Sequence, residues 1–247
     1  MSKVLLANLE DGIFQLQIDD PENENRLSEE LCDELMTALT HLATEPSLKV
    51  LILSGRSDVF CAGASLDTIK QVVSGNADVK DLSLPNQLLS FPVPIIAALQ
   101  GHAVGGGLAL ALYCDLAIAS ENSRYGVNFT DLGFTPGMGI LSVLPAMVGH
   151  HFASEMLLTA KLYKGKELNG RGLFNYIVPA EEVMTLALDM ARRIAEKPRH
   201  VLEMVKDTLC LPRRQALQAA LSREHLMHKI CFGVPGTLAH IEAAYLA

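Results

Sequence analysis

The polar and apolar positions of the first fifty residues predict a hairpin followed by a helix. Two short runs rich in aliphatic residues, 4–9 and 13–18, flank Asp11-Gly12, a pair typical of tight hairpin turns. Ser28 precedes two glutamates, which suit the first turn of a helix, and leucines follow at helical spacing at positions 31, 35, 39 and 42. We therefore expect two paired strands and then a helix that begins at Ser28.

Further along, three continuous apolar runs replace the alternating pattern. They cover residues 50–53, 95–99 and 116–119, and helical stretches lie between them. Strands that are apolar throughout are typical of a parallel sheet buried on both faces, and strands that alternate with helices are typical of βαβ units. The pattern predicts an α/β fold with a mostly parallel sheet.

The last third of the chain is predicted to be helical. Its helical segments span residues 181–196, 199–210 and 212–232. Pro198 and Pro212 divide these segments, because proline interrupts a helix, and Pro235 opens a final short helix. We expect one domain, with a core over residues 1–180 and a helical region over residues 181–247.

The composition is that of a folded, acidic protein. Hydrophobic residues make up 49% of the 247 residues and charged residues 19%, with a formal net charge of −8. This charge argues against a nucleic-acid partner, although local basic patches toward an anionic carrier are compatible with it. The longest apolar run, residues 108–114, is too short to span a membrane, the start is not a signal peptide, and five scattered cysteines suit a reducing compartment. We expect a cytoplasmic protein.

Two loops rich in small residues follow the first two predicted parallel strands. "FCAGASLDTIK" follows the strand at 50–53, and "QGHAVGGGLALAL" follows the strand at 95–99. Both lead into a helix, so both present unpaired backbone N–H groups at the carboxyl ends of strands, where this architecture binds ligands. Two such loops facing each other could direct two N–H groups at one developing negative oxygen.

Four motifs of the chain resemble those of the crotonase (enoyl-CoA hydratase/isomerase) superfamily. These are "VFCAGASL", "PVPIIAALQGHAVGGGLALALYCDLAIAS", "DLGFTPGMGILSVLPAMVG" and "LTAKLYKGKELNGRGLFNYIVP". The resemblance implies a spiral of ββα units with a helical C-terminal trimerisation region that also covers the active site, assembled as a homotrimer or a dimer of trimers. It also implies an acyl thioester substrate whose carbonyl is held by the backbone N–H groups of Ala64 and Gly106, beside Gly63 and Gly105.

Hydratases of that superfamily use two glutamates to activate water, and this sequence has neither. The first position is occupied by Ala109 and the second by Phe129, which cannot hold or deprotonate water. Asp131 is close in sequence, but it points elsewhere if Phe129 lines the site. We expect Phe129, Phe134 and Met138 to form apolar walls of an acyl pocket, and we expect no hydratase activity.

"NFTDLGFTPGMG", "AEKPRHVLEMVKD" and "EHLMHKICF" resemble one branch of the superfamily, the decarboxylases of polyketide β-branching. The resemblance implies decarboxylation of 3-methylglutaconyl-acyl carrier protein, or its coenzyme A thioester, to the 3-methylcrotonyl thioester in polyketide biosynthesis. His228 would donate the proton or orient the carboxylate. The branch also uses a lysine; ungapped matching places Asp78 there, so we expect Lys80 in this role, with Lys70 as second choice.

No cofactor or metal ion is predicted. "TPGMG" lacks the third glycine and the ribose-binding acid of a dinucleotide fingerprint, which argues against NAD or FAD. Glu224, His225 and His228 share one predicted helix without a fourth ligand or a known zinc motif, which argues against a metal site.

Two other functions stay open. An enoyl thioester isomerase would need the same pair of N–H groups together with a base that faces the substrate. A catalytically inactive relative that binds an acyl carrier as a scaffold would need neither. The sequence does not distinguish a carrier protein from coenzyme A, nor a trimer from a hexamer.

Overall fold

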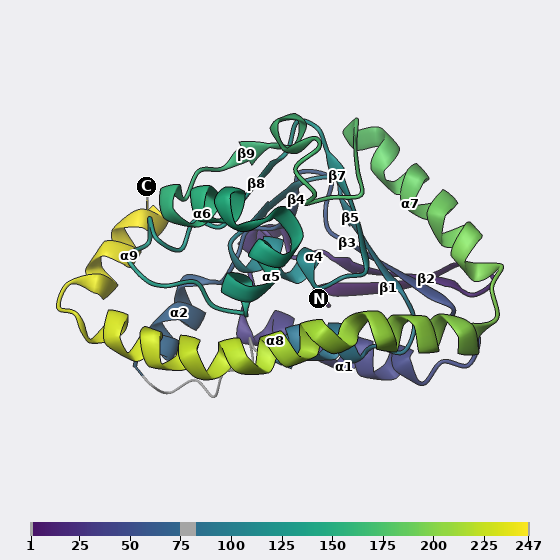
Figure 1. Ribbon diagram of the computed structural model, residues 1–247, viewed down its shortest axis with the longest axis horizontal. Coiled ribbons are helices and arrows are strands. Elements are labelled where there is room, and N and C mark those ends of the chain that lie inside the picture. The colour runs from purple at the N-terminus through teal and green to yellow at the C-terminus, as the bar shows by residue number, and fades with distance from the viewer. Residues whose placement is uncertain (1, 75–82, 247) are drawn as a thin grey trace.

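The computed structural model describes residues 2–74 and 83–246, which form two sheets enclosed by helices (Figure 1). The larger sheet has the order β1-β2-β3-β5-β7-β10. Its strands are β1 (Val4–Glu10), β2 (Ile13–Ile18), β3 (Val50–Ser54), β5 (Ile95–Leu99), β7 (Leu116–Ser120) and β10 (Tyr176–Val178). Only β1 runs antiparallel to its neighbour in this sheet. The predicted hairpin and parallel sheet are therefore confirmed.

The smaller sheet consists of short strands that the hydrophobic pattern did not predict. They are β4 (Val59–Cys61), β6 (His102–Val104), β8 (Arg124–Gly126) and β9 (Tyr163–Lys164), in that order. β4, β6 and β8 are parallel, and β9 is antiparallel to β8. Three parallel strands of the larger sheet are each followed by a short strand of the second sheet: β3 by β4, β5 by β6 and β7 by β8. Helices follow the first two of these pairs, so the predicted spiral of ββα units is confirmed.

Helices cover both faces of the larger sheet. They are α1 (Glu29–Ala43), α2 (Leu66–Val73), α3 (Ser83–Ser90), α4 (Gly106–Leu112), α5 (Ile140–Val148), α6 (His150–Thr159), α7 (Ala180–Ala195), α8 (Arg199–Gly233) and α9 (Thr237–Leu246), with 3₁₀ turns at Pro21–Asn23 and Gly165–Leu168. Ser28 is the N-cap of α1, directly before the first helical residue, and its side chain accepts a hydrogen bond from the amide of Leu31. No helix within the described part of the chain is long and apolar enough to cross a bilayer.

Two apolar cores lie on opposite sides of the larger sheet. On one side, Val183, Ala187 and Ala191 of α7 pack on Val50 and Ile52 of β3 and on the neighbouring strands. The other side carries the larger core, which includes α1, α3, α4 and parts of the loops that follow the short strands. The division of the chain at residue 180 stays a prediction, and α7, the first helix beyond it, packs on the sheet.

The sequence predicted two helices separated at Pro212, and this is wrong. α8 runs through Pro212 as one helix of 35 residues, which lies along one side of the molecule (Figure 1). A proline inside a helix costs about 3 kcal/mol because it removes one amide donor. Contacts on both sides of Pro212 offset this cost. Cys210 and Leu217 are buried, and the Arg213 guanidinium donates hydrogen bonds to the carbonyl oxygens of Leu112 and Cys114.

Candidate active site

The loops after β4 and β6 lie against each other, because these two strands are parallel neighbours. A methyl group placed on Gly63 would lie 3.8 Å from the amide nitrogen of Gly106, and one placed on Gly106 would lie 3.9 Å from the amide nitrogen of Ala64. Within residues 2–74 and 83–246, no group accepts a hydrogen bond from the amide of Ala64 or Gly106. The sequence-predicted pair of unpaired N–H groups is thus brought together at one place.

Glycine is required at two positions of the second loop. Gly105 has φ +57° and ψ −121°, a conformation that residues with side chains rarely adopt, and it caps the start of α4. A side chain on Gly107 would overlap the carbonyl oxygen of Cys61 at the end of β4. The consecutive glycines therefore permit both the sharp turn and the close approach of the two loops.

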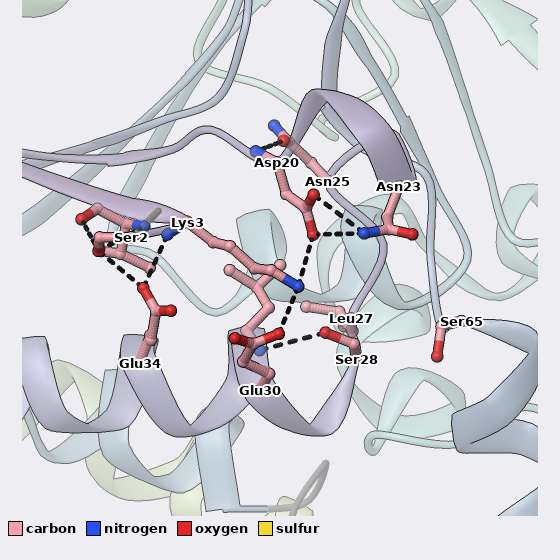
Figure 2. A network of polar contacts seen from close by, with 12 residues as sticks. Ser2, Lys3, Asp20, Asn23, Asn25, Leu27, Ser28, Glu30, Glu34 and Ser65 are labelled. Atoms are coloured by element: carbon pink, nitrogen blue, oxygen red, sulfur yellow. Dashed lines mark hydrogen bonds and ion pairs between the residues drawn. The ribbon is translucent and has the colours of Figure 1, made fainter.

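The buried side chain of Asn25 supports the first loop through hydrogen bonds to neighbouring backbone groups. Asn25 accepts a hydrogen bond from the amide of Asp20 at 2.7 Å and donates hydrogen bonds to the carbonyl oxygens of Ile18 and Phe60. Figure 2 shows the network around it, in which the Lys3 ammonium bridges Asp20 and Glu30. These contacts connect the end of β2 to β4, and so they fix where the loop after β4 begins.

Two cavities meet at the unpaired amides. The larger, of about 310 Å³, is bordered by both loops and by Arg26, Leu132 and Tyr245 among others. The smaller, of about 80 Å³, is bordered by apolar side chains and by His228. Five residues border both cavities: Ala64, Ile69, Gly106, Phe129 and Phe134. The two amides therefore lie at the boundary between an open cavity and an apolar one.

The three residues predicted to form apolar walls all border these cavities. Phe129 and Phe134 border both cavities and meet edge to face with ring centroids 5.8 Å apart, and Met138 borders the smaller one. All three side chains are more than nine-tenths buried. Asp131 is exposed and borders neither cavity. The side chain of Phe129 next to the two amides is therefore an aromatic ring, which cannot hold or deprotonate water.

His228, on α8, is half-buried beside Phe134 and Phe232. Its Nε2 lies 2.8 Å from the carbonyl oxygen of Thr135. Since a carbonyl oxygen only accepts hydrogen bonds, Nε2 carries a proton and Nδ1 has the free lone pair of the neutral ring. Burial lowers the pKa of His228 from its ordinary value, although hydrogen bonding to the carbonyls of Thr135 and Pro136 opposes this. The lowered pKa favours the neutral imidazole.

The other predicted site residues are placed as follows. Ala109 is fully buried in α4 and borders neither cavity. Lys70 forms an ion pair with Glu242 of α9 at 2.9 Å, which raises the pKa of the lysine, and it also borders neither cavity. Lys80 and Asp78 lie outside the described residues. Among the residues described, no three His, Cys, Asp or Glu side chains are grouped so that they could hold a metal ion.

The sequence did not indicate two polar residues that border the larger cavity, Arg26 and Tyr245. The Tyr245 hydroxyl of α9 donates a hydrogen bond of 2.8 Å to the carbonyl oxygen of Ala64. The Arg26 guanidinium lies 5.1 Å from the centre of the Tyr245 ring and donates to the carbonyl oxygen of Ala62. Tyr245 is 181 positions away from Ala64 in the chain, so no local pattern could have revealed this contact.

The model of the family described as enoyl-CoA hydratase/isomerase matches residues 8–239 of the chain. The chain belongs to this family. Among the curated members, the bacillaene synthase decarboxylase PksI of Bacillus subtilis (strain 168) is 35% identical over 244 residues, which cover 99% of this chain and 98% of that protein.

Solved structures of family members extend the comparison. A structure from a dehydratase/decarboxylase enzyme couple involved in polyketide β-branching is 35% identical, with a TM-score of 0.95 over 99% of both chains. The ECH2 decarboxylase domain of CurF from Lyngbya majuscula is 32% identical, with a TM-score of 0.91 over 98% of this chain and 99% of that one. Two of these three relatives are named as decarboxylases, and the third structure comes from the dehydratase/decarboxylase couple. The two solved structures share the fold along essentially the whole chain.

Proposed function

We propose that this family member is a carboxy-lyase that converts 3-methylglutaconyl-acyl carrier protein to the 3-methylcrotonyl thioester. One observation carries the proposal. The two unpaired amides of Ala64 and Gly106 lie between an apolar wall, which contains Phe129, and a half-buried histidine. Such a site can stabilise an enolate, but it lacks the carboxylates that hold water in a hydratase. The relatives named above support the same reaction class.

The reaction begins with cleavage of the bond between the substrate carboxylate and its neighbouring carbon. The electron pair of this bond passes through the adjacent double bond to the thioester oxygen, and carbon dioxide leaves. The amides of Ala64 and Gly106 then donate hydrogen bonds to the oxygen as it gains negative charge, which stabilises the transition state more than the substrate. A proton adds to the carbon that carried the carboxylate and completes the product.

His228 is the proposed proton donor. A substrate carboxylate in the smaller cavity raises the pKa of His228, because a nearby opposite charge favours the charged form of the imidazole. The imidazolium then orients the carboxylate and, after carbon dioxide has left, gives a proton to the dienolate. Because the substrate carboxylate raises this pKa, His228 takes up its proton from solvent when the substrate binds.

The apolar side chains of the smaller cavity act on the carboxylate. Phe129, Phe134, Met138 and Phe232 replace water around a localised charge with groups that cannot donate hydrogen bonds. In the dienolate the same charge is delocalised toward the amides, so the loss of hydration destabilises the dienolate less than the carboxylate. A lysine that pairs with the carboxylate fits the scheme, and Lys80 keeps this proposed role, with Lys70 as the alternative.

We propose that a second copy of the chain covers the apolar face of α8 in a trimer or a dimer of trimers. Met204, Leu209, Leu226 and Ile230 of this helix are all at least 60% exposed. Large apolar side chains that gather along one exposed helix are typical of an interface. Sedimentation of the purified protein tests this, and a monomer at micromolar concentration would overturn it.

The decisive experiment is intact-mass spectrometry of 3-methylglutaconyl-acyl carrier protein after incubation with the purified protein, expressed in the cytoplasm. We expect the mass of one carbon dioxide to be lost. The coenzyme A thioester is tested in parallel. Turnover of that form alone would mean that the substrate is carried by coenzyme A and not by a carrier protein. An unchanged mass together with a shifted double bond, detected by proton NMR, would favour an isomerase. Carrier binding without any chemistry would favour a scaffold.

A further inference from the structure

We infer that Tyr113 and Glu224 act as positioning residues for the reaction, because they clamp the peptide unit between Met138 and Gly139 from both ends. The Tyr113 hydroxyl donates a hydrogen bond of 2.7 Å to the carbonyl oxygen of Met138. The amide of Gly139 donates one of 3.0 Å to Oε2 of Glu224. The Met138 carbonyl and the Gly139 amide belong to the same peptide unit, so the two hydrogen bonds together fix the orientation of that unit. The effect on catalysis rests on the proposed function.

The clamped peptide has an unusual backbone. Met138 has φ +58° and Gly139 has φ +71°, so two consecutive residues lie in the left-handed region. For glycine this costs little, but a methionine in this region is uncommon. Rotation of this peptide unit changes ψ of Met138 and φ of Gly139, and it would break both hydrogen bonds. The clamp therefore opposes such a rotation in a segment whose backbone is already unusual.

The clamped peptide joins Met138, whose side chain borders the site, to Gly139. The sulfur atom of Met138 lies 3.1 Å from the position of a methyl group built on Gly106, whose amide is one of the two unpaired donors. Met138 also borders the smaller cavity together with His228. At the other end of the same loop, His228 is hydrogen-bonded to the carbonyl of Thr135. Glu224, which binds Gly139, and His228, which binds Thr135, are one turn apart on α8, so this helix holds the loop at two points.

The burial of Glu224 supports a role other than packing. Its side chain is 2% exposed, and its second oxygen, Oε1, has no hydrogen-bond partner in the described part of the chain. A buried, half-satisfied carboxyl group is costly, and an aliphatic side chain would fill the same space without that cost. Its one hydrogen bond goes to the loop that forms a wall of the site.

The test compares variants that remove or retain the clamp. Glu224→Leu and Tyr113→Phe each remove one hydrogen bond, whereas Glu224→Gln retains an oxygen that can accept from Gly139. The control is Glu203→Leu, on the same helix, where the glutamate pairs with Arg199 at the surface. We expect kcat to fall about 10-fold to 100-fold in the first two variants, with KM changed by less than about 3-fold, because displacement of a wall misaligns the bound substrate. Glu224→Gln and the control keep kcat within about 3-fold of the wild type.

Hydrogen–deuterium exchange of the peptide that covers residues 135–140 gives a second readout, which does not depend on activity. We expect faster exchange in Glu224→Leu and Tyr113→Phe, and wild-type exchange in Glu224→Gln. Unchanged exchange in the first two variants overturns the clamp. Faster exchange with unchanged kcat overturns its positioning role. An inactive wild type overturns the proposed function instead, and the clamp is then judged on exchange alone.

Discussion

The Nε2 atom of His228 lies 2.8 Å from the carbonyl oxygen of Thr135, which belongs to the loop that also supplies Met138. This bond fixes the ring and assigns the proton of the neutral form to Nε2. Nδ1 is therefore the nitrogen that can take up and release a proton during a reaction. The bond to Thr135 also joins α8 to the loop, so His228 and the wall residue Met138 are held relative to each other.

His228→Gln tests the acid directly. Glutamine can still donate a hydrogen bond to Thr135, but it cannot transfer a proton, so we expect the rate of carbon dioxide loss to fall by about 10²–10⁴-fold. The matched control is His225→Gln, because His225 is exposed on the same helix and should keep wild-type activity. A rate for His228→Gln within fivefold of the control, measured by mass spectrometry of the carrier, would remove His228 from the mechanism.

The amide of Gly106 is tested by a pair of substitutions. Gly106→Ala and Gly106→Pro both place a carbon near the Met138 sulfur and Leu27, about 3.1 and 3.2 Å away, but only proline removes the N–H. Proline is tolerated in the first turn of a helix, where Gly106 lies. We expect the proline variant to be slower than the alanine variant by about 10²–10³-fold in kcat. Equal rates in two folded variants would mean that this amide does not stabilise the enolate.

Phe129→Glu places a carboxylate in the wall next to the two amides, at the position where the motif resemblance predicts a hydratase glutamate. The new charge would repel the substrate carboxylate across the apolar cavity, so we expect kcat/KM for decarboxylation to fall at least about tenfold below that of Phe129→Gln. We also expect no hydrated product, because Ala109 occupies the position of the second glutamate. Detection of a product heavier by one water would contradict this interpretation of the two positions.

The stability of the protein should depend on pH through Glu224. Burial raises the pKa of this carboxyl group from 4.5 to about 7, so between these values the folded state holds more protons than the unfolded state. The free energy of unfolding therefore falls as pH rises from about 4.5 to about 7, by on the order of 2–3 kcal/mol. We expect Glu224→Gln to be more stable than the wild type at pH 8, and the difference to shrink at pH 5, in urea denaturation. An unchanged difference between the two pH values would contradict the raised pKa.

The buried ion pair of Lys206 and Asp115 attaches α8 to the strands. The lysine is 3% exposed, lies 2.9 Å from the carboxylate and also donates to the carbonyl oxygen of Val93. We expect Lys206→Met to cost about 3–5 kcal/mol, because it leaves a charge without its partner, and Asp115→Asn in the same chain to restore part of the loss. The exposed pair of Arg193 and Asp189 is the control, and Arg193→Met should cost under about 1 kcal/mol. Similar costs at both sites, from urea midpoints, would contradict the account.

Much of the fold could be predicted because its signals are local. Asp11-Gly12 marks the hairpin, Ser28 caps a helix, and apolar runs mark the buried parallel strands. The strands of the second sheet were missed because β4 and β6 have only three residues each, and their pairing joins segments about forty residues apart. The continuity of α8 was missed because tertiary contacts on both sides of Pro212 outweigh the local cost of a proline.

The candidate site could be predicted only in part. Small residues after two strands predicted the two loops that carry the unpaired amides, and the motifs predicted roles for Phe129 and His228. Nothing in the local pattern distinguished Glu224 as the partner of Gly139, since the two are 85 positions apart. Contacts of this kind depend on how α8 is placed, and hydrophobic periodicity determines only which face of a helix is buried.

The left-handed backbone of Met138 has a consequence for how the protein could change over time. A residue with a side chain in this region costs of order 1–3 kcal/mol, and a glycine there would remove most of that cost. Selection for stability alone would therefore favour glycine at position 138 and would lose the thioether that borders the site. At this position, the residue that is best for stability differs from the residue that borders the site. Substitutions intended to raise the thermal stability of the enzyme should therefore leave Met138 unchanged.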